Sequence, residues 1–367
     1  MIDVGRSKRA QQAFAFDDIT IVPSRRTRGE EEVSLQWRID AYTFAFPVLA
    51  APMDSVVSPA TAIKIGQLGG LGVLNLEGLW TRYDDPQPKL EEIIAIEDPI
   101  EATRQMQRIY AEPIKPELIG KRVAQIREAG VPTAGALSPQ NTQAYAQAVV
   151  DSGVDFFVIR GTTVSAEHVS SDLEPLNLKK FIYELDVPVI VGGCATYQAA
   201  LHLMRTGAAG VLVGFGGGAA HTTRTVLGVA VPMASAVADV AAARRDYMDE
   251  SGGRYVHVIA DGSIGRSGDI AKAIACGADA VMIGSPLARA TDVPGKGFHW
   301  GAEAHHADLP RGERVEFGTV GTLQEILFGP SRVADGTMNL MGALRRAMAT
   351  TGYTELKEFQ RIEVVVQ

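Results

Sequence analysis

The sequence has almost no cysteine, no excess of positive charge and no long apolar run, and each absence excludes a class of protein. Its two cysteines, Cys194 and Cys276, form no CxxC pair, which argues against structural zinc and a disulfide framework and fits a reducing compartment. A formal net charge of −8 disfavours a general nucleic-acid-binding surface. No stretch approaches the roughly 18 apolar residues of a membrane span, and the opening MIDVGRSKRAQQ has no signal-peptide core. We therefore expect a cytoplasmic protein that binds neither nucleic acid nor membrane.

The chain does contain a repeated helix-to-strand pattern. In four segments a glycine ends a helical stretch and an unbroken apolar run follows soon after: 68–76, 151–160, 206–215 and 276–285. Glycine is common just after a helix, and an apolar run without alternation indicates a strand that is buried on both faces. Four further apolar runs bring the candidate strands to eight: 46–53, 131–137, 187–194 and 256–263.

The segments between these runs have the apolar spacing of amphipathic helices, for example 139–151, 196–206 and 267–275. Eight strands that alternate with helices predict an α/β fold, a (β/α)8 TIM barrel, as a single domain over 1–367. A doubly wound parallel sheet is the alternative. We expect residues 78–130 to be a helical connection, and residues 288–335, rich in glycine and proline, to be a long active-site flap.

A dense glycine loop follows the sixth candidate strand. It reads VGFGGGAAHTTR over 213–224, with four glycines in five positions before His221. Glycine tolerates positive φ and lets the backbone approach a ligand or ion closely. Loops of this kind usually carry function on an α/β scaffold.

Two further turns predict a phosphate site. TIM barrels often hold phosphate in the loops after strands seven and eight. Here Gly262, Ser263 and Gly265 precede a helix after the seventh run, and Gly284-Ser285 follows the eighth. Helix N-terminal amides and a small hydroxyl suit phosphate, and Asp261 is placed to accept hydrogen bonds from a ribose diol. In the alternative reading, these glycines only make tight turns.

Six motifs, in order along the chain from about residue 14, resemble the IMP dehydrogenase/GMP reductase family. They are AFDDITIVP (15–23), APMDSV (51–56), LGGLGVLN (68–75), the glycine loop (213–224), VIADGSIGRSGDIAKAIACGADAVMIGS (258–285) and LMGALRRAM (340–348). The resemblance implies a barrel of purine metabolism and GMP biosynthesis, commonly a homotetramer or higher oligomer. It also implies a purine nucleoside 5′-monophosphate as ligand and NAD or NADP as cofactor. The paired CBS module of typical IMP dehydrogenases is missing, as it is from GMP reductases, because residues 76–130 are too short for it.

The resemblance also assigns roles to residues. Substrate binding falls to the base-packing Met53, the ribose-binding Asp261, and the phosphate positions and their neighbours, namely Gly218, Gly262, Ser263, Gly284 and Ser285. Cofactor binding falls to Arg160, Gly161, Gly214 and Gly216. Backbone carbonyls of Gly216, Gly218 and His221 are candidates for holding K⁺.

The departures from the family pattern concern the chemistry itself. His221 stands where the family has a catalytic cysteine, whose thiolate attacks purine C2 so that hydride can leave to the cofactor. Ala51 and Ala219 replace serines that contact substrate and phosphate. Arg160 replaces an aspartate that contacts the cofactor ribose, and Phe317, in EFGTVGTLQ, stands where a tyrosine is usual.

Other residues offer possible compensation. Cys194 follows the fifth run and is either a relocated thiol or a packed small residue, whereas Cys276 is expected to be structural. Three flap histidines and an acid suggest either a metal site or solvated side chains: His299, Glu303, His305 and His306. Arg224 is expected to order its loop.

We therefore predict an IMP dehydrogenase-related nucleotide-binding barrel with weak or absent IMP oxidation. His221 and Thr223 are the catalytic candidates, and His221 is expected above all to line the site or contact the base. The alternatives are a non-catalytic regulatory protein, a GMP reductase-like enzyme and a barrel that binds flavin mononucleotide.

Overall fold

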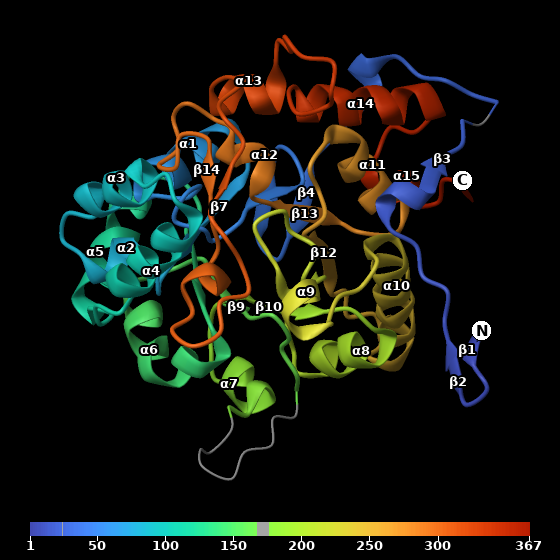
Figure 1. Cartoon of the computed structure of the whole chain (residues 1–367). Coiled ribbons are helices and arrows are strands. Elements are labelled where there is room, and N and C mark those ends of the chain that lie inside the picture. The colour runs from blue at the N-terminus through green and yellow to red at the C-terminus, as the bar shows by residue number, and fades with distance from the viewer. Residues whose placement is uncertain (24, 167–175) are drawn as a thin grey trace.

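A closed barrel of eight parallel strands forms the centre of the protein (Figure 1). The computed structural model describes residues 1–23, 25–166 and 176–367. The strands follow their chain order around the barrel: β6 (Val48–Ala50), β7 (Leu71–Asn75), β8 (Ala134–Leu137), β9 (Phe156–Arg160), β10 (Val189–Cys194), β11 (Gly210–Val213), β12 (His257–Asp261) and β13 (Ala280–Ile283). Each lies within one predicted run, so the (β/α)8 prediction is confirmed and the doubly wound sheet is wrong.

The glycines of the repeated pattern end helices as predicted. Gly69, Gly153, Gly207 and Gly277 have φ of 100°, 77°, 100° and 113°. A residue with a Cβ atom is strained at such angles, which is why glycine marks the end of each helix. The pattern therefore identified where helices end, as well as where strands begin.

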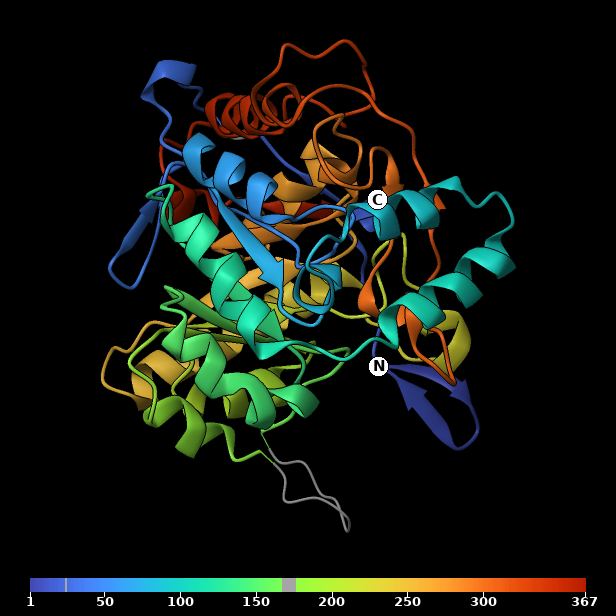
Figure 2. The same cartoon turned by 90° about the vertical axis from the view of Figure 1, so that its left-hand side faces the viewer.

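Helices surround the barrel and cover its outer face (Figures 1 and 2). The longer ones are α1 (Pro59–Leu68), α5 (Pro116–Arg127), α6 (Pro139–Asp151), α7 (Leu178–Tyr183), α8 (Tyr197–Arg205), α10 (Met233–Glu250), α11 (Ser267–Ala275) and α14 (Leu340–Thr351). Short helical turns are η1 (Phe16–Asp18), η2 (Glu30–Glu32), α9 (Thr223–Leu227), α12 (Ser285–Ala288) and α15 (Leu356–Phe359). Because both faces of the strands are covered, every barrel strand is buried along most of its length.

An aromatic hairpin closes the amino-terminal end of the barrel. It consists of β4 (Trp37–Ile39) and β5 (Tyr42–Phe44), and the rings of Trp37 and Phe44 stack at 5.3 Å. Trp37 donates to His257 at the start of β12, and the Tyr42 hydroxyl donates to Asp155 just before β9. With this end closed, the carboxyl ends of the strands are left to form a site.

Residues 78–130 form helices that pack against the flap. The helices are α2 (Leu79–Arg82), α3 (Gln87–Ala95), α4 (Pro99–Tyr110) and α5. The segment 288–335 is more ordered than the predicted loop, with β14 (Phe298–His299) paired to β15 (Val315–Glu316), followed by α13 (Leu323–Phe328); η3 (Ala302–His305) lies between the two strands. A separate apolar cluster joins the two segments through Met106, Tyr110, Trp300 and Ala304. The flap is therefore anchored by an apolar contact rather than freely exposed.

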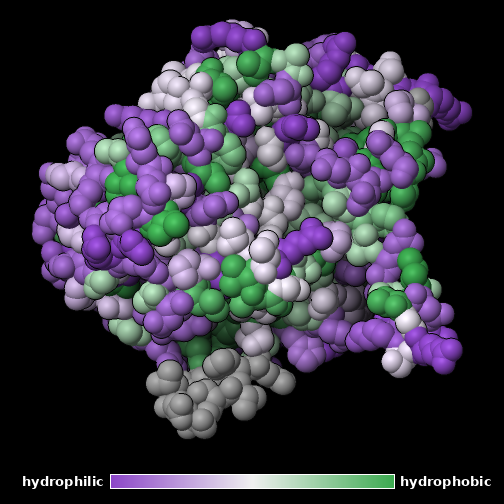
Figure 3. Space-filling view, viewed as in Figure 1, coloured by the Kyte–Doolittle hydropathy of each residue, from purple (hydrophilic) through white to green (hydrophobic). Residues whose placement is uncertain are grey.

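The chain ends form two small sheets outside the barrel. β1 (Ile2–Gly5) and β2 (Lys8–Ala10) make a hairpin that stands away from the body and carries apolar surface (Figures 1 and 3). β16 (Val364–Val366) pairs with β3 (Ile19–Ile21). Across the described parts of the chain, no helix combines the length and apolarity needed to cross a membrane.

Candidate functional site

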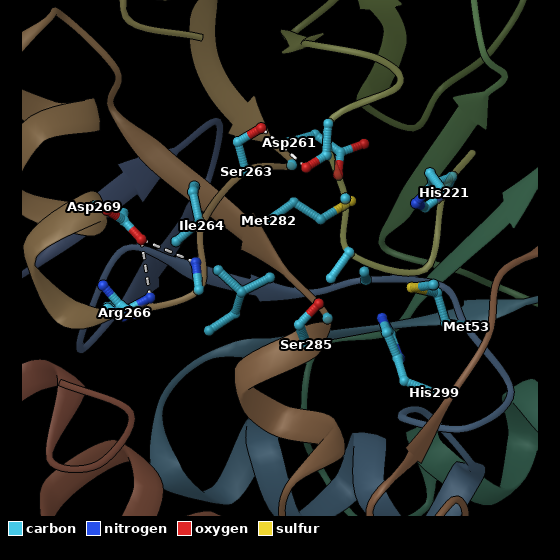
Figure 4. Close-up of a pocket in the computed structure, with 18 of the residues that line it drawn as sticks. Met53, His221, Asp261, Ser263, Ile264, Arg266, Asp269, Met282, Ser285 and His299 are labelled. Carbon is cyan, nitrogen blue, oxygen red and sulfur yellow. Dashed lines mark hydrogen bonds between the residues drawn. The ribbon is translucent and has the colours of Figure 1, made fainter. Parts of the chain in front are cut away.

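A cavity of about 400 Å³ opens at the carboxyl end of the barrel (Figure 4). The loops after β6, β11, β12 and β13 line it, together with the last residue of β9 and residues of the flap. All the predicted substrate-binding positions lie on this cavity: Met53, Gly218, Asp261, Gly262, Ser263, Gly284 and Ser285. Residues 53 and 285, which are distant in sequence, therefore belong to one site.

The expected phosphate end is built by the turns after β12 and β13. Gly262 and Ser263 both have positive φ, 105° and 56°, and the Ser263 hydroxyl donates to the Gly217 carbonyl at 3.0 Å. The start of α11 differs from the prediction. The Asp269 carboxylate accepts hydrogen bonds from the backbone N–H groups of Gly265 and Arg266, each at 3.0 Å, so these amides are already capped (Figure 4).

The predicted ribose acceptor, Asp261, is paired with an arginine. The Arg160 Nε donates to the Asp261 Oδ2 at 2.8 Å, and the two side chains are 16% and 10% exposed. Burial alone lowers the pKa of Arg160, but Asp261 and then Glu303 raise it above its ordinary value. Arg160 was expected to meet the cofactor, and the pairing gives it a partner within the protein. Gly161 lies beside it on a smaller adjoining cavity.

His221 is paired with a flap residue that the sequence did not single out as its partner. Its Nε2 lies 3.1 Å from Glu303 Oε2. Burial alone raises the pKa of Glu303, but His221 and then Arg160 bring it well below its ordinary value, so the carboxylate is charged. Within the described residues, His221 Nδ1 and the Thr223 hydroxyl are buried without a hydrogen-bond partner. The sequence contains an acidic residue in the flap and a histidine at the position of the family cysteine. Their separation in sequence does not indicate that the two side chains are in contact.

The expected base end contains Met53 and an unpredicted histidine contact. His299 is 2% exposed, and its Nδ1 lies 3.2 Å from the Ser55 hydroxyl. A Cβ atom on Gly284 would lie 2.9 Å from both the Met53 sulfur and the His299 Cε1. Burial, with a smaller effect of His221, lowers the pKa of His299 to about 3, so the ring is neutral. From the sequence, His299 is predicted to be either a metal ligand or a solvated side chain, and neither matches this contact.

The histidines of the flap do not form the metal site that the sequence allowed. His305 stacks on Tyr110 with ring centroids 3.5 Å apart, and His306 Nδ1 accepts from backbone N–H groups. His299 is bonded to Ser55 instead. In the described ranges, no three histidine, cysteine, aspartate or glutamate side chains are grouped to hold a metal ion. The flap metal hypothesis is therefore wrong for this arrangement.

Neither cysteine replaces the missing nucleophile. Cys194 is 1% exposed and its thiol points to the Leu212 carbonyl at 3.4 Å. Burial raises the pKa of Cys194 to about 12, and it does not line the cavity. Burial also raises the pKa of Cys276, at the end of α11, to about 11. The structure thus contradicts a relocated thiol and leaves both cysteines as packing residues.

The glycine loop needs its glycines for close packing. Gly214 and Gly216 have positive φ of 117° and 69°. A Cβ atom on Gly214 would lie 2.5 Å from the Asp261 carbonyl oxygen, and one on Gly218 would lie 2.5 Å from His221 Nδ1. The Gly218 carbonyl also accepts from the His221 N–H at 2.9 Å. The predicted cofactor and K⁺ roles of this loop stay predictions.

The replaced family positions also lie on the cavity. Ala51 and Ala219 both line it and present no hydroxyl. Phe317 lines it from the flap, with the Arg289 guanidinium over its ring at 5.1 Å. At these three positions the cavity is thus lined by side chains without a hydroxyl group.

Comparison with known proteins supports the resemblance. The model of the IMP dehydrogenase / GMP reductase domain matches residues 13–307. An uncharacterized oxidoreductase of Mycolicibacterium smegmatis is 53% identical, with both chains fully covered. The inosine-5′-monophosphate dehydrogenase of Methanocaldococcus jannaschii is 26% identical over 96% of this chain and 92% of its own.

A solved structure agrees with the fold over the whole chain. It is an IMP dehydrogenase/GMP reductase-like protein of Corynebacterium glutamicum, which is 49% identical, with a TM-score of 0.95. The match covers 100% of this chain and 97% of the other. Family model, full-length relatives and fold thus agree, and the chain belongs to the IMP dehydrogenase/GMP reductase family.

Proposed function

We propose that the protein binds a purine nucleoside 5′-monophosphate in the cavity at the carboxyl end of the barrel. One observation carries the proposal: Met53, Asp261, Ser263, Gly284 and Ser285 line a single cavity. The base lies on Met53 beside His299, the ribose faces Asp261, and the phosphate lies against the turns after β12 and β13. The helix-start amides of Gly265 and Arg266 take no part, because Asp269 holds them.

The proposal includes weak or absent turnover of IMP. The family reaction needs a nucleophile that bonds to purine C2 and leaves again, and a thiolate suits both steps. His221 instead has its Nε2 beside the charged Glu303, so it lines the site as a polar contact. Neither cysteine can supply the nucleophile. Cys194 is buried, burial raises the pKa of both thiols, and neither lines the cavity.

The residues present do not fit the nicotinamide cofactor in the way the family uses it. A carboxylate that accepts from the cofactor ribose is replaced by Arg160, and that guanidinium is held by Asp261 at 2.8 Å. The proposed function therefore includes no hydride transfer. Binding of K⁺ by the backbone carbonyls of Gly216, Gly218 and His221 is a secondary proposal, tested by comparing nucleotide affinity in potassium and in sodium buffers.

The test is calorimetric titration of the folded protein with IMP, XMP and GMP. We expect at least one to bind with a dissociation constant below millimolar. The same nucleotides are then mixed with NAD, or GMP with NADPH, while absorbance at the NADH wavelength is followed, and we expect little or no change. Failure of all three nucleotides to bind at millimolar concentration would refute the assignment.

The other candidates give different results. Robust NADPH oxidation with GMP would favour a GMP reductase-like enzyme. A yellow chromophore in the purified protein would favour flavin mononucleotide. Binding without turnover is the result expected of a non-catalytic regulatory protein.

We also propose a cytoplasmic homotetramer or higher oligomer. The family resemblance supports it, and the projecting β1–β2 hairpin leaves Ile2 and Val4 52% and 69% exposed, which a neighbouring subunit would cover. Analytical ultracentrifugation tests the assembly, and a monomer at micromolar concentration would contradict it.

A further inference from the structure

The ion pair between Arg160 and Asp261 bears on which sugar the site accepts. We infer that Arg160 is a specificity-determining residue that satisfies the ribose acceptor, so that 2′-deoxyribonucleoside and ribonucleoside purine monophosphates bind with similar affinity. The inference rests on the proposed function, because it concerns the ligand of the same cavity. Nothing in the family resemblance implies it, since the family position of Arg160 holds an aspartate.

Arg160 contacts a residue on a strand that is not its neighbour in the barrel. Arg160 ends β9 and Asp261 ends β12, and two strands, β10 and β11, separate them in the barrel. The Arg160 Nε nevertheless lies 2.8 Å from the Asp261 Oδ2. Both side chains line the cavity, and neither is more than 16% exposed. A ribose facing Asp261 would therefore meet a carboxylate that already accepts from the guanidinium.

A second carboxylate also favours the charged guanidinium. Glu303 lies close enough to act on Arg160 electrostatically, and its Oε2 is 3.1 Å from His221 Nε2. The guanidinium is thus bonded to Asp261 and is further stabilised by the charge of Glu303, which is itself paired with His221. Withdrawal of Arg160 would leave Asp261 as a buried charge without its bonded partner, which is strongly unfavourable. We expect the ion pair to persist when a nucleotide binds.

Selection for a hydroxyl depends on what its absence leaves behind. A site rejects an analogue that lacks a hydroxyl when a buried polar group is then left unpaired. Here the Asp261 carboxylate is paired with Arg160 whether or not a 2′-hydroxyl is present. Loss of the hydroxyl leaves the carboxylate with its guanidinium partner, so the free-energy difference between the two sugars is small.

The experiment compares IMP with 2′-deoxy-IMP, and GMP with 2′-deoxy-GMP, by calorimetry on the unmodified protein. We expect the dissociation constants within each pair to agree within about threefold, because no buried group loses its partner. A preference for the ribonucleotide of tenfold or more would overturn the inference and leave the proposed function intact. If no purine monophosphate binds, the proposed function fails and this inference fails with it.

A variant tests the cause. Arg160→Met removes the guanidinium and frees Asp261, so we expect the ribonucleotide preference to rise to about tenfold or more. Arg289→Met is the matched control, because Arg289 lines the same cavity and lies over Phe317 instead of Asp261. The preference should not change in the control. An equal change in both variants would contradict a specific role for Arg160.

The double variant Arg160→Met with Asp261→Asn covers the case in which the single variant does not fold. It leaves neither charge of the ion pair behind. We expect it to bind both sugars within about threefold, as the unmodified protein does. A tenfold preference in the double variant would show that some group other than Asp261 selects the sugar.

Discussion

Glu303 Oε2 lies 3.1 Å from His221 Nε2, with each side chain 11% exposed. The pair joins the flap to the glycine loop at the position that the resemblance assigns to the family's catalytic cysteine. A charged carboxylate at this place suits a histidine, because imidazole can donate to it. It would not suit a thiolate, since two negative charges would then lie side by side. The loss of the cysteine and the presence of Glu303 are therefore chemically consistent with each other.

The first prediction concerns a thiol introduced at position 221. We expect His221→Cys to remain inactive toward IMP and NAD, because Glu303 raises the pKa of the new thiol and keeps it protonated. Removing the charge as well, in His221→Cys with Glu303→Gln, should make the thiol react at least tenfold faster with a disulfide reagent at pH 7.5, about one pKa unit of difference.

The reagent assay has a low background, because Cys194 is buried and burial raises the pKa values of Cys194 and Cys276 to about 12 and about 11. The unmodified protein is the control and should react slowly in its native state. Equal reaction rates in the single and double variants would show that Glu303 does not govern this position.

A second prediction concerns Asp54, next to Met53, the residue proposed to pack on the purine base. Its Oδ2 accepts from the Tyr110 hydroxyl at 2.7 Å, whereas its Oδ1 is buried and has no partner in the described residues. Burial raises the pKa of Asp54 to about 6, against smaller opposing effects of Tyr110 and Leu79. Between about pH 4 and pH 6, Asp54 is therefore protonated in the folded state and ionised in the unfolded state. The stability that this difference provides is complete below about pH 4 and is lost as pH rises through about 6.

Asp54→Asn stays neutral at every pH and should avoid that loss. Relative to the unmodified protein, the free energy of unfolding of the variant should rise by about 2–3 kcal/mol between pH 4 and pH 8. Urea denaturation at several pH values measures the difference. Parallel pH profiles for the two proteins would mean that Asp54 is not protonated in the fold.

The barrel strands could be predicted because their signal is local. A strand buried on both faces gives an unbroken apolar run, and Gly69, Gly153, Gly207 and Gly277 mark the preceding helix ends. The charged pairs of the site could not be found in this way. Arg160 and Asp261 are 101 residues apart, and His221 and Glu303 are 82 apart. The sequence shows an arginine at position 160 where the family has an aspartate. Only the closed barrel shows which carboxylate pairs with that arginine.

The cap at the start of α11 was missed for a related reason. The sequence alone indicates no hydrogen-bond partner for the backbone amides of Gly265 and Arg266. Unpaired amides at a helix start favour a phosphate. Asp269, four residues beyond Gly265, accepts both N–H groups through one oxygen. An acidic residue in the first helical turn was the available signal.

A third prediction concerns stability at low pH. Asp279 is buried and accepts from Arg244 at 2.6 Å and from Lys357 at 3.0 Å, with Tyr255 and the Val258 N–H also bonded. Burial opposes its charge, but Arg244 and Lys357 lower the pKa of Asp279 to about 2. Its contribution is therefore present above the ordinary aspartate pKa and is lost as pH falls toward 2.

Asp279→Asn leaves Arg244 and Lys357 without their charged partner. We expect a loss of about 3 kcal/mol in the free energy of unfolding at pH 7, narrowing as pH falls below 4. Chemical denaturation at pH 7 and pH 3 distinguishes this from a simple loss of packing, which would be equal at both.

The last prediction addresses the base end of the cavity directly. A Cβ atom on Gly284 would lie 2.9 Å from the Met53 sulfur, 2.9 Å from His299 Cε1 and 3.2 Å from His299 Nε2. His299 is buried and bonded to Ser55, so its ring cannot easily move away. Gly284→Ala should therefore push Met53 toward the space proposed for the purine and weaken IMP binding at least tenfold, about 1.4 kcal/mol. Gly268→Ala is the matched control, because a Cβ atom there meets nothing within 4 Å and lies in α11, outside the cavity. The control should keep its affinity and gain slightly in stability, since alanine favours a helix over glycine. If both variants bind IMP as the unmodified protein does, the base does not lie against Gly284 and Met53.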